Sequence, residues 1–599
     1  MQNPSWHERD LIIEAVAVDE TPKVPWALTP EALAKVQVPV PEPPEPARED
    51  EAREPVVDLR RTTPRDVAIA AALACVGVLS VLFTYRGIGY SWDEAFYRAP
   101  AQRTVEWLAE FWLDQSWAGS DEAIREFWCG NEDPATRRPM WIIELPSVVK
   151  WAMGSSWALT RDWSSELRAL RLPAALAFGF SVFLIYLLTL NSYRRRAAVI
   201  AATAFMTMPC VFGHAHIAAT ETITNAVLLL SIYCFFRGLN SVWWAILFGI
   251  AYGIALDTKI NALLLAPVLL VWGHAFHRRS YVNNFFLMVF LAPLVWIALW
   301  PWLWHDTAAR LAEYFRFFAT HQLTRVWYLG RQYPMVTLDG VVSVPWHYPV
   351  LTTLVTVPLP VLLFAIFGLA RTAVHCRWEY RGILFTGYAV VVLLHASLPG
   401  SPKYDSARLF FSLFPMLAIL AGGGADSVAG IIPFDQKIRG TLGVRQLVAI
   451  VFFAIIAGNG IWAIVRIHPH ELSYFNILTH GLKGAETRFE TSYWGESFNE
   501  EVITYLNTLP QGARIRPMAM QVLVPVHLQE WGILRDDLRF DTAGLYRDYD
   551  YFLLHVRKGM FGEAEKYLFE RTPEKVFDFR GVAFFCLYSR KEAGELAKM

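Results

Sequence analysis

The feature that most constrains this chain is a series of about eleven apolar runs, because a membrane-spanning helix needs roughly 20 mostly apolar residues, with a range of about 17–25. We predict spans at residues 67–85, 167–189, 197–213, 222–236, 241–256, 260–276, 283–300, 349–371, 382–398, 408–425 and 446–465. The charged share of 18% is low beside the roughly 25% of soluble proteins. The sequence therefore predicts a polytopic α-helical membrane protein.

Basic residues predict the orientation of these spans, because cytoplasmic loops carry an excess of lysine and arginine. Such residues precede the first predicted span and follow the second, fourth, sixth, eighth and tenth. All of them lie on one side if the N-terminus is cytoplasmic. With an odd number of spans, the C-terminus then lies outside.

The predicted spans divide the chain into three parts. Residues 1–62 contain "VPVPEPPEPAREDEAREP" and are predicted to be a disordered cytoplasmic tail, because such a composition buries too little apolar surface to offset ordering. Residues 63–466 form the transmembrane domain, which includes the outer loops 86–166 and 301–348. Residues 467–599 are expected to form a soluble extracytoplasmic α/β domain, with a helix at "NEEVITYLNTL" and strands at "RIRPMAM", "DYDYFLLHV" and "GVAFFCLYS".

Ionisable and other polar residues gather where the predicted spans reach the outer face. The acidic pair Asp93 and Glu94, in "SWDEAFY", directly follows the first span. The same face receives Glu144, Lys150, His214, His216, Glu221, Asp257, Lys259, Lys403, Tyr404 and Arg408. Carboxylates combined with several cations suit a substrate that carries a phosphate, because lysine and arginine neutralise the phosphate while a carboxylate acts as general base.

Each of these groups also has a simpler interpretation. An acidic pair at the interface can be the solvated start of a loop, and Lys259 can extend its ammonium group to the interface. His214 and His216 can be metal ligands, but such histidines are more often interfacial polar groups. The chain has no CxxC motif and no cysteine–histidine cluster typical of zinc sites. Its net charge of -1 gives no indication of nucleic-acid binding.

The motifs at these positions resemble the C-type, polyprenol-phosphate-dependent glycosyltransferases of family 39. This family includes dolichyl-phosphate-mannose protein mannosyltransferases and the bacterial aminoarabinose transferase that acts on lipid A. The motifs concerned are "SWDEAFY", "ELPSVVK", "HIAATE", the Thr258–Lys259 turn and "RLFFSLFP". Glu221 stands where the family commonly has Asp, and Leu145 and Ser147 depart from the "EHPPLxK" pattern.

The resemblance implies transfer of a sugar from a polyprenyl-phosphate donor to an acceptor hydroxyl, with inversion, at the outer face of the cytoplasmic (inner) membrane of a bacterium. It implies Asp93 as general base, with Glu94 and Glu221 as further catalytic carboxylates. Lys259, Lys403 and Arg408 would bind the donor phosphate. The residues expected to position donor or acceptor are Glu144, Lys150, His214, His216 and Tyr404. No cofactor is obligatory in this scheme, and a divalent metal is compatible with it.

Other functions fit parts of the same pattern. One is a lipid-to-lipid glycosyl or oligosaccharide transferase on the same scaffold. Another is a transporter or flippase for a lipid-linked sugar, but such proteins often carry internal repeats and mid-membrane polar residues, and we find neither. A third is a membrane-anchored binding protein that acts through residues 467–599. The sequence identifies neither the sugar nor the acceptor, which can be a protein, a lipid or a glycan.

Overall fold

The computed structural model of the protein describes residues 62–129, 146–320, 325–333, 344–374, 380–431, 437–438 and 442–598. Apart from Thr62, the predicted N-terminal tail lies outside these residues. The described residues form one compact unit. The predicted division of this unit at residue 467 stays a prediction.

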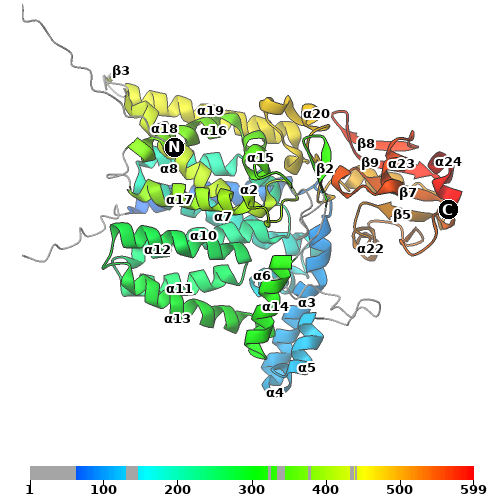
Figure 1. Ribbon diagram of the computed structural model, residues 1–599, viewed down its shortest axis with the longest axis horizontal. Helices are drawn as coiled ribbons and strands as arrows, with labels where there is room; N and C mark the ends of the chain where they lie inside the picture. The colour runs from blue at the N-terminus through cyan, green and yellow to red at the C-terminus, as the bar shows by residue number, and fades with distance from the viewer. Residues whose placement is uncertain are drawn as a thin grey trace, which may run out of the picture. The chain divides into compact units, whose positions relative to one another are not determined.

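Long apolar helices dominate the described part of the chain and lie side by side (Figure 1). Among the described residues, six are long and apolar enough to cross a membrane. They are α2 (Pro64–Thr84), α7 (Glu166–Ser192), α13 (Val282–Leu299), α17 (Tyr380–Ser397), α18 (Leu413–Ile431) and α19 (Val444–Ile467). The predicted multi-pass helical membrane class is confirmed.

Other helices, most of them shorter, occupy the remaining predicted spans. They are α8 (Arg195–Met206), α9 (Pro209–His214), α10 (Thr220–Gly238), α11 (Val242–Leu256), η2 (Ile260–Leu264), α12 (Leu265–Phe276), α15 (Tyr348–Thr356), α16 (Leu359–Val374) and η4 (Arg408–Phe410). Every predicted span therefore coincides with helical structure. The count of about eleven spans stays a prediction, because several of these helices are shorter than the roughly 17 residues that a span needs.

Small residues allow the apolar helices to pack closely, as they do in membrane proteins generally. At the contact of α16 with α18, a Cβ atom on Gly368 would collide with the backbone of Leu420, and one on Gly424 would collide with the carbonyl of Phe364. Most of α18 is buried, whereas α2 is largely exposed. The protein thus places α18 at the centre of the helical part and α2 at its rim.

Helices outside the predicted spans lie in the two loops that are predicted to face outward. The first loop contains α3 (Trp92–Leu113), α4 (Gln115–Ala118), α5 (Asp121–Ile124), the π-helical turn η1 (Arg125–Cys129) and α6 (Ser147–Thr160). The second contains η3 (Pro301–Trp304), α14 (Thr307–Thr320) and the hairpin of β1 (Val326–Tyr328) and β2 (Arg331–Tyr333). Much of "VEWLAEFWLDQSW" lies in α3 and α4, and α6 begins at Ser147 within the motif "ELPSVVK".

The C-terminal part contains a five-stranded mixed sheet in the order β6-β5-β7-β9-β8. Its strands are β5 (Arg514–Met518), β6 (Arg539–Phe540), β7 (Tyr551–His555), β8 (Lys575–Phe579) and β9 (Val582–Ser589). The helices are α20 (Gly481–Ala485), α21 (Glu500–Leu506), α22 (Leu523–Glu530), α23 (Glu563–Phe569) and α24 (Arg590–Ala593). The three predicted strands and the predicted helix at α21 are confirmed, and β6 and β8 are additions.

Several contacts join this sheet-containing part to the helices. Trp531 Nε1 donates a hydrogen bond to Glu166 Oε2 at 2.9 Å, and Tyr90 Oη lies 3.0 Å from His527 Nδ1. Arg98 on α3 pairs with both Glu166 and Glu530. The start of α3, which carries the predicted base, is therefore in contact with the C-terminal part.

Candidate active site

Asp93 lies in the first turn of α3, directly after the helix begins. Ser91 is the N-cap, and its backbone N–H donates a hydrogen bond of 2.9 Å to Glu94 Oε2. Acidic residues are favourable in a first turn because the exposed N–H groups carry partial positive charge. This local preference accounts for an acidic pair at the point where the chain leaves the first span.

The two acids of this pair have different environments. Glu94 is 1% exposed, and its Oε1 accepts hydrogen bonds from Arg171 Nε at 2.6 Å and from the N–H of Ala218 at 2.9 Å. Arg171 Nη2 donates to the second oxygen at 2.9 Å. These contacts indicate a structural role for Glu94, and its predicted catalytic role stays a prediction.

Glu221 lies in the first turn of α10, between the third and fourth predicted spans. Its Oε1 accepts hydrogen bonds from Lys259 Nζ at 2.7 Å and from Arg408 Nε at 3.0 Å. Within the described residues, its buried Oε2 has no hydrogen-bond partner. Glu221 therefore keeps one acceptor oxygen for another group.

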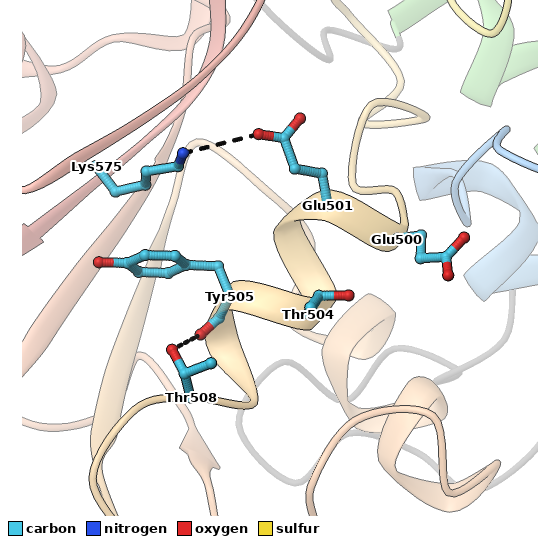
Figure 2. Close-up of a pocket in the computed structure, with 6 residues that line it drawn as sticks. All are labelled: Glu500, Glu501, Thr504, Tyr505, Thr508 and Lys575. Atoms are coloured by element: carbon cyan, nitrogen blue, oxygen red, sulfur yellow. Dashed lines mark hydrogen bonds and ion pairs between the residues drawn. The ribbon is translucent and has the colours of Figure 1, made fainter.

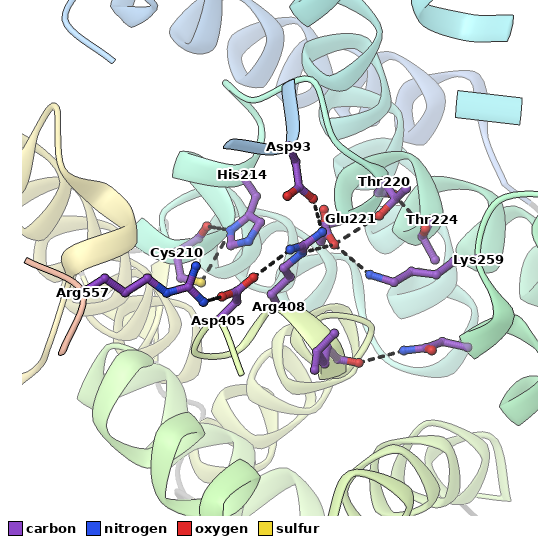
Figure 3. A network of polar contacts seen from close by, with 12 residues as sticks. Asp93, Cys210, His214, Thr220, Glu221, Thr224, Lys259, Asp405, Arg408 and Arg557 are labelled. Carbon is purple, nitrogen blue, oxygen red and sulfur yellow. Dashed lines mark hydrogen bonds and ion pairs between the residues drawn. The ribbon is translucent and has the colours of Figure 1, made fainter. Parts of the chain in front are cut away.

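Arg408 connects the two predicted catalytic regions (Figure 3). Its Nη2 pairs with Asp93, its Nε pairs with Glu221, and its Nη1 donates to Asp405 Oδ2 at 2.7 Å. The guanidinium carbon also lies 4.5 Å from the centre of the Trp494 ring. We call Asp93, Glu221, Lys259, Asp405 and Arg408 the charged cluster.

Asp93 and Glu221, the two carboxylates of the charged cluster that are predicted to be catalytic, differ in exposure and in electrostatic environment. The Asp93 side chain is 18% exposed, whereas that of Glu221 is 1% exposed, so Asp93 is the carboxylate that a substrate can reach. Burial raises the pKa of Asp93 to about 6. The nearby carboxylates of Glu221 and Asp405 also raise this pKa, whereas the positive charge of Arg408 lowers it. A base with a pKa near the working pH combines a large ionised fraction with good proton affinity.

The structure does not bring all the predicted phosphate-binding residues together. Lys403 is buried, and its Nζ donates hydrogen bonds to the carbonyl oxygens of Leu398 at 2.5 Å and Ser401 at 3.2 Å. Burial lowers the pKa of Lys403 to about 8. Tyr404 is also buried, beside Asp405 in the same turn. Lys259 and Arg408 are therefore the predicted cations that the structure places in the charged cluster.

The two histidines are held by their own helix turns. His214 Nδ1 lies 2.7 Å from the carbonyl oxygen of Cys210, and His216 Nδ1 lies 2.7 Å from that of Phe212. His216 Nε2 lies 2.9 Å from Thr84 Oγ1 at the end of α2. His214 packs against Trp494 with a ring separation of 5.1 Å, so it borders the charged cluster.

The residues predicted in "ELPSVVK" are only partly within the described chain. Glu144 lies outside it. Lys150 on α6 is buried, with its ammonium group 5.9 Å from the centre of the Trp128 ring. At the start of α6, the backbone N–H and the hydroxyl of Ser147 donate hydrogen bonds of 3.0 Å and 2.6 Å to the Asp257 carboxylate. Burial raises the pKa of Asp257 to about 8. The first outer loop is thus fixed to the turn that carries Lys259.

Sequence reasoning missed two charged residues of this network. Asp405 stands between the predicted residues Tyr404 and Arg408, three residues before Arg408. Arg557 follows strand β7, and its Nη2 donates to Asp405 Oδ1 at 2.5 Å. No local signal marks Arg557, because an arginine after a strand is ordinarily a solvated loop residue.

Among the described residues, no group of three or more His, Cys, Asp or Glu side chains is arranged to hold a metal ion. The predicted compatibility with a divalent metal stays a prediction. A surface pocket lies on the C-terminal part, lined by Glu500, Glu501, Thr504, Tyr505, Thr508 and Lys575 (Figure 2). It contains none of the predicted site residues.

A family model supports the predicted class of enzyme. Residues 144–305 match the model described as dolichyl-phosphate-mannose-protein mannosyltransferase. The matched region includes Glu221 and Lys259 but neither Asp93 nor Arg408. It confirms, over this part of the chain, the predicted resemblance to polyprenol-phosphate-dependent glycosyltransferases. Among proteins of curated function, none matches this sequence.

Three solved structures illustrate which known proteins the chain is similar to. ArnT from Cupriavidus metallidurans, bound to undecaprenyl phosphate, is 14% identical over 89% of this chain and 98% of that chain, with a TM-score of 0.47. The Archaeoglobus fulgidus oligosaccharyltransferase tethered with an acceptor peptide is 11% identical over 88% and 74% of the two chains, with a TM-score of 0.47. Arabinofuranosyltransferase AftD from mycobacteria is 14% identical over 83% and 35%, with a TM-score of 0.40. Similarity at this level assigns no role to any residue here.

Proposed function

We propose that this protein transfers a sugar from a polyprenyl-phosphate donor to an acceptor hydroxyl, with inversion, at the outer face of the cytoplasmic membrane. One observation supports this most: two carboxylates and two cations converge from four distant segments. Each of these segments adjoins the end of an apolar helix. The family match over residues 144–305 supports the donor class.

The location of the charged cluster suits a lipid-linked donor. Each buried methylene of a lipid chain is worth about 0.8 kcal/mol, so a polyprenyl chain stays in the bilayer and its sugar stays at the surface. An enzyme acting on such a donor must carry its charged groups at the ends of its spans. Asp93, Glu221 and Lys259 occupy such positions, next to α2, α10 and α11 respectively.

Asp93 is the proposed general base. It accepts the proton of the acceptor hydroxyl, and the hydroxyl oxygen forms a bond to the anomeric carbon on the face opposite the phosphate. The bond from that carbon to the phosphate oxygen breaks, and the polyprenyl phosphate leaves with the electron pair. Lys259 and Arg408 are partly exposed, at 18% and 15%, so the phosphate can reach them. Their positive charge stabilises the leaving group.

Glu221 is proposed to orient a sugar or acceptor hydroxyl. Its Oε1 already accepts from two cations, and within the described residues its Oε2 has no partner. A buried acceptor without a donor is costly, so a substrate hydroxyl that donates to Oε2 would bind favourably. The acceptor, whether protein, lipid or glycan, enters from the aqueous side.

Mass spectrometry of lipid-linked sugars and glycoconjugates tests this function in cells that lack the protein. We expect one polyprenyl-phosphate sugar to accumulate and one glycan modification to disappear. When the Asp93→Asn variant is expressed in these cells, it should correct neither defect, because general-base assistance is worth about 10²–10⁴ in rate. Asp162→Asn is the matched control, since its carboxylate is 91% exposed and lies outside the charged cluster.

The same experiment separates the alternatives. If Asp93→Asn restores the modification as well as the unmodified protein does, the proposed base is wrong, and a transporter or flippase of a lipid-linked sugar becomes the better interpretation. The accumulated donor identifies the sugar, and the missing glycan identifies the acceptor.

A further inference from the structure

A single arginine of the C-terminal part extends into the charged cluster (Figure 3). Arg557 follows strand β7 and is 3% exposed. Its Nη2 donates to Asp405 Oδ1 at 2.5 Å, and its Nη1 donates to the carbonyl oxygen of Tyr493 at 2.8 Å. Its Nε also lies 3.9 Å from Glu490 Oε1, so Arg557 faces two buried carboxylates, of which Asp405 is the one it contacts at hydrogen-bond distance. A buried guanidinium is costly unless it is paired, so these partners define where it must lie.

Asp405 is held between two guanidinium groups. Its Oδ1 accepts from Arg557, while its Oδ2 accepts from Arg408 Nη1 at 2.7 Å. Asp405 and the next residue, Ser406, both have φ of 54°, in the left-handed region that non-glycine residues seldom adopt. Such conformations persist where surrounding contacts enforce them. The two arginines supply such contacts, one from each part of the protein.

The guanidinium group of Arg408 has a fixed number of N–H donors and pairs with three carboxylates. Its Nη2, Nε and Nη1 contact Asp93, Glu221 and Asp405 respectively. If Asp405 had Arg408 as its sole cation, it would attract the guanidinium away from the other two acids. Arg557 supplies a second positive charge to Asp405 and so relieves this competition.

We propose that Arg557 is a positioning residue of the active site. It fixes and neutralises Asp405, and it thereby keeps Arg408 directed at Asp93 and Glu221. The C-terminal part would then complete the active site electrostatically. The inference depends on the proposed function only for the role of Asp93 as base.

A purely structural role for Arg557 makes a different prediction. An arginine that only fastens the C-terminal part to the helices would affect unfolding but not the titration of Asp93. That titration responds to every charge around it. The groups that act on Asp93 or are coupled to it are Arg408, Glu221, Asp405, Lys259, Tyr97, Tyr404 and Arg557.

Charge substitutions at the two partners should move the titration of Asp93 in opposite directions. Arg557→Gln removes a positive charge, so the pKa of Asp93 should rise by about 0.5–1 unit. Asp405→Asn removes a negative charge, so the pKa should fall by about the same amount. In the double variant the two changes offset each other, and the pKa should return close to that of the unmodified protein.

Infrared difference spectroscopy of the detergent-solubilised full chain measures this titration through the carboxyl C=O stretch. The Asp93→Asn variant identifies the band. Arg557→Lys keeps the charge and should leave the band's midpoint nearly unchanged. Trp531→Phe is the matched control, because it removes the 2.9 Å hydrogen bond to Glu166 between the same two parts without changing any charge. It should leave the midpoint unchanged, whatever it does to thermal stability.

The inference is overturned if Arg557→Gln lowers the unfolding temperature but leaves the Asp93 midpoint in place. If Arg557→Gln does not fold, Asp405→Asn still tests the inference. An Asp93 midpoint that does not fall in the Asp405→Asn variant contradicts it. This readout follows a carboxyl group rather than sugar transfer. If Asp93→Asn retains transfer, the proposed function fails, and the opposite shifts still measure the coupling of Arg557 to Asp93.

Discussion

At the scale of single residues, the site depends on two carboxylates placed in different environments. Two cations neutralise Glu221, whereas Asp93 contacts Arg408 and is partly open to solvent. Groups whose environments separate their proton affinities can take separate roles in acid–base chemistry. We therefore propose Asp93 as the group that exchanges a proton and Glu221 as the group that stays charged and orients a substrate.

The pH dependence of sugar transfer checks this assignment. Because burial raises the pKa of Asp93 to about 6, the base is protonated and inactive below that pH. We expect kcat/KM to increase about tenfold per pH unit on the acid side and to level off above about pH 6. The measurement is a pH–rate profile in membranes that contain the protein, with the donor identified by mass spectrometry. A flat profile between about pH 5 and 7 would contradict the role of Asp93.

At the scale of helices, one buried ion pair sets the position of α3. Arg171 on α7 binds both oxygens of Glu94 and also donates to the carbonyl oxygens of Ile88 at 3.1 Å and Gly89 at 2.6 Å. Glu94 in turn accepts from the N–H of Ala218, just before α10. The pair thus fixes the start of α3, and with it Asp93, relative to α7 and α10.

Removing one partner of this pair should destabilise the protein strongly. We expect Glu94→Ala to cost about 3–5 kcal/mol, because it leaves the Arg171 guanidinium buried without its carboxylate. Glu106→Ala is the matched control on the same helix, since Glu106 forms a half-exposed pair with Arg103 that is worth about 0–1 kcal/mol. Thermal unfolding in detergent compares the two variants. Equal losses of stability would show that the Glu94 pair is not what holds α3.

At the scale of the whole molecule, the charged cluster requires that the contributing helix ends face one compartment. The starts of α3 and α10 carry Asp93 and Glu221, and contacts within the charged cluster bring them together. The orientation of this face relative to the cell interior is predicted from the basic loops alone.

Cysteine labelling determines this orientation. Glu563 is 93% exposed in the C-terminal part, and a Glu563→Cys variant should react with a membrane-impermeant maleimide from outside the cytoplasmic membrane. Arg194 lies in a loop predicted to be cytoplasmic, so Arg194→Cys should react only after permeabilisation. The reverse pattern would place the charged cluster on the cytoplasmic face and would contradict the predicted orientation.

Local sequence patterns predicted much of the fold. Apolar runs located the helices at every predicted span, and β-branched and aromatic runs located β5, β7 and β9. The strand β6 was missed because a strand of two residues carries little periodic signal, and β8 was missed although it is as long as β5 and β7. Asp93, Glu221, Lys259 and Arg408 were identifiable because they stand at the predicted ends of apolar spans and within the motifs of the family resemblance.

What the sequence determined by itself is therefore which segments enter the membrane and which ionisable residues stand at their ends, since both depend on the transfer of local groups between water and lipid. Only the tertiary structure decided how those residues are paired. It pairs Glu94 with Arg171 rather than with the partners of the neighbouring Asp93, and it directs Lys403 to backbone carbonyl oxygens. It also brings Arg557 into contact with Asp405, which lies 152 positions away in the sequence. Ion pairs depend on distance in space, and distance in space between remote segments is set by packing rather than by local pattern.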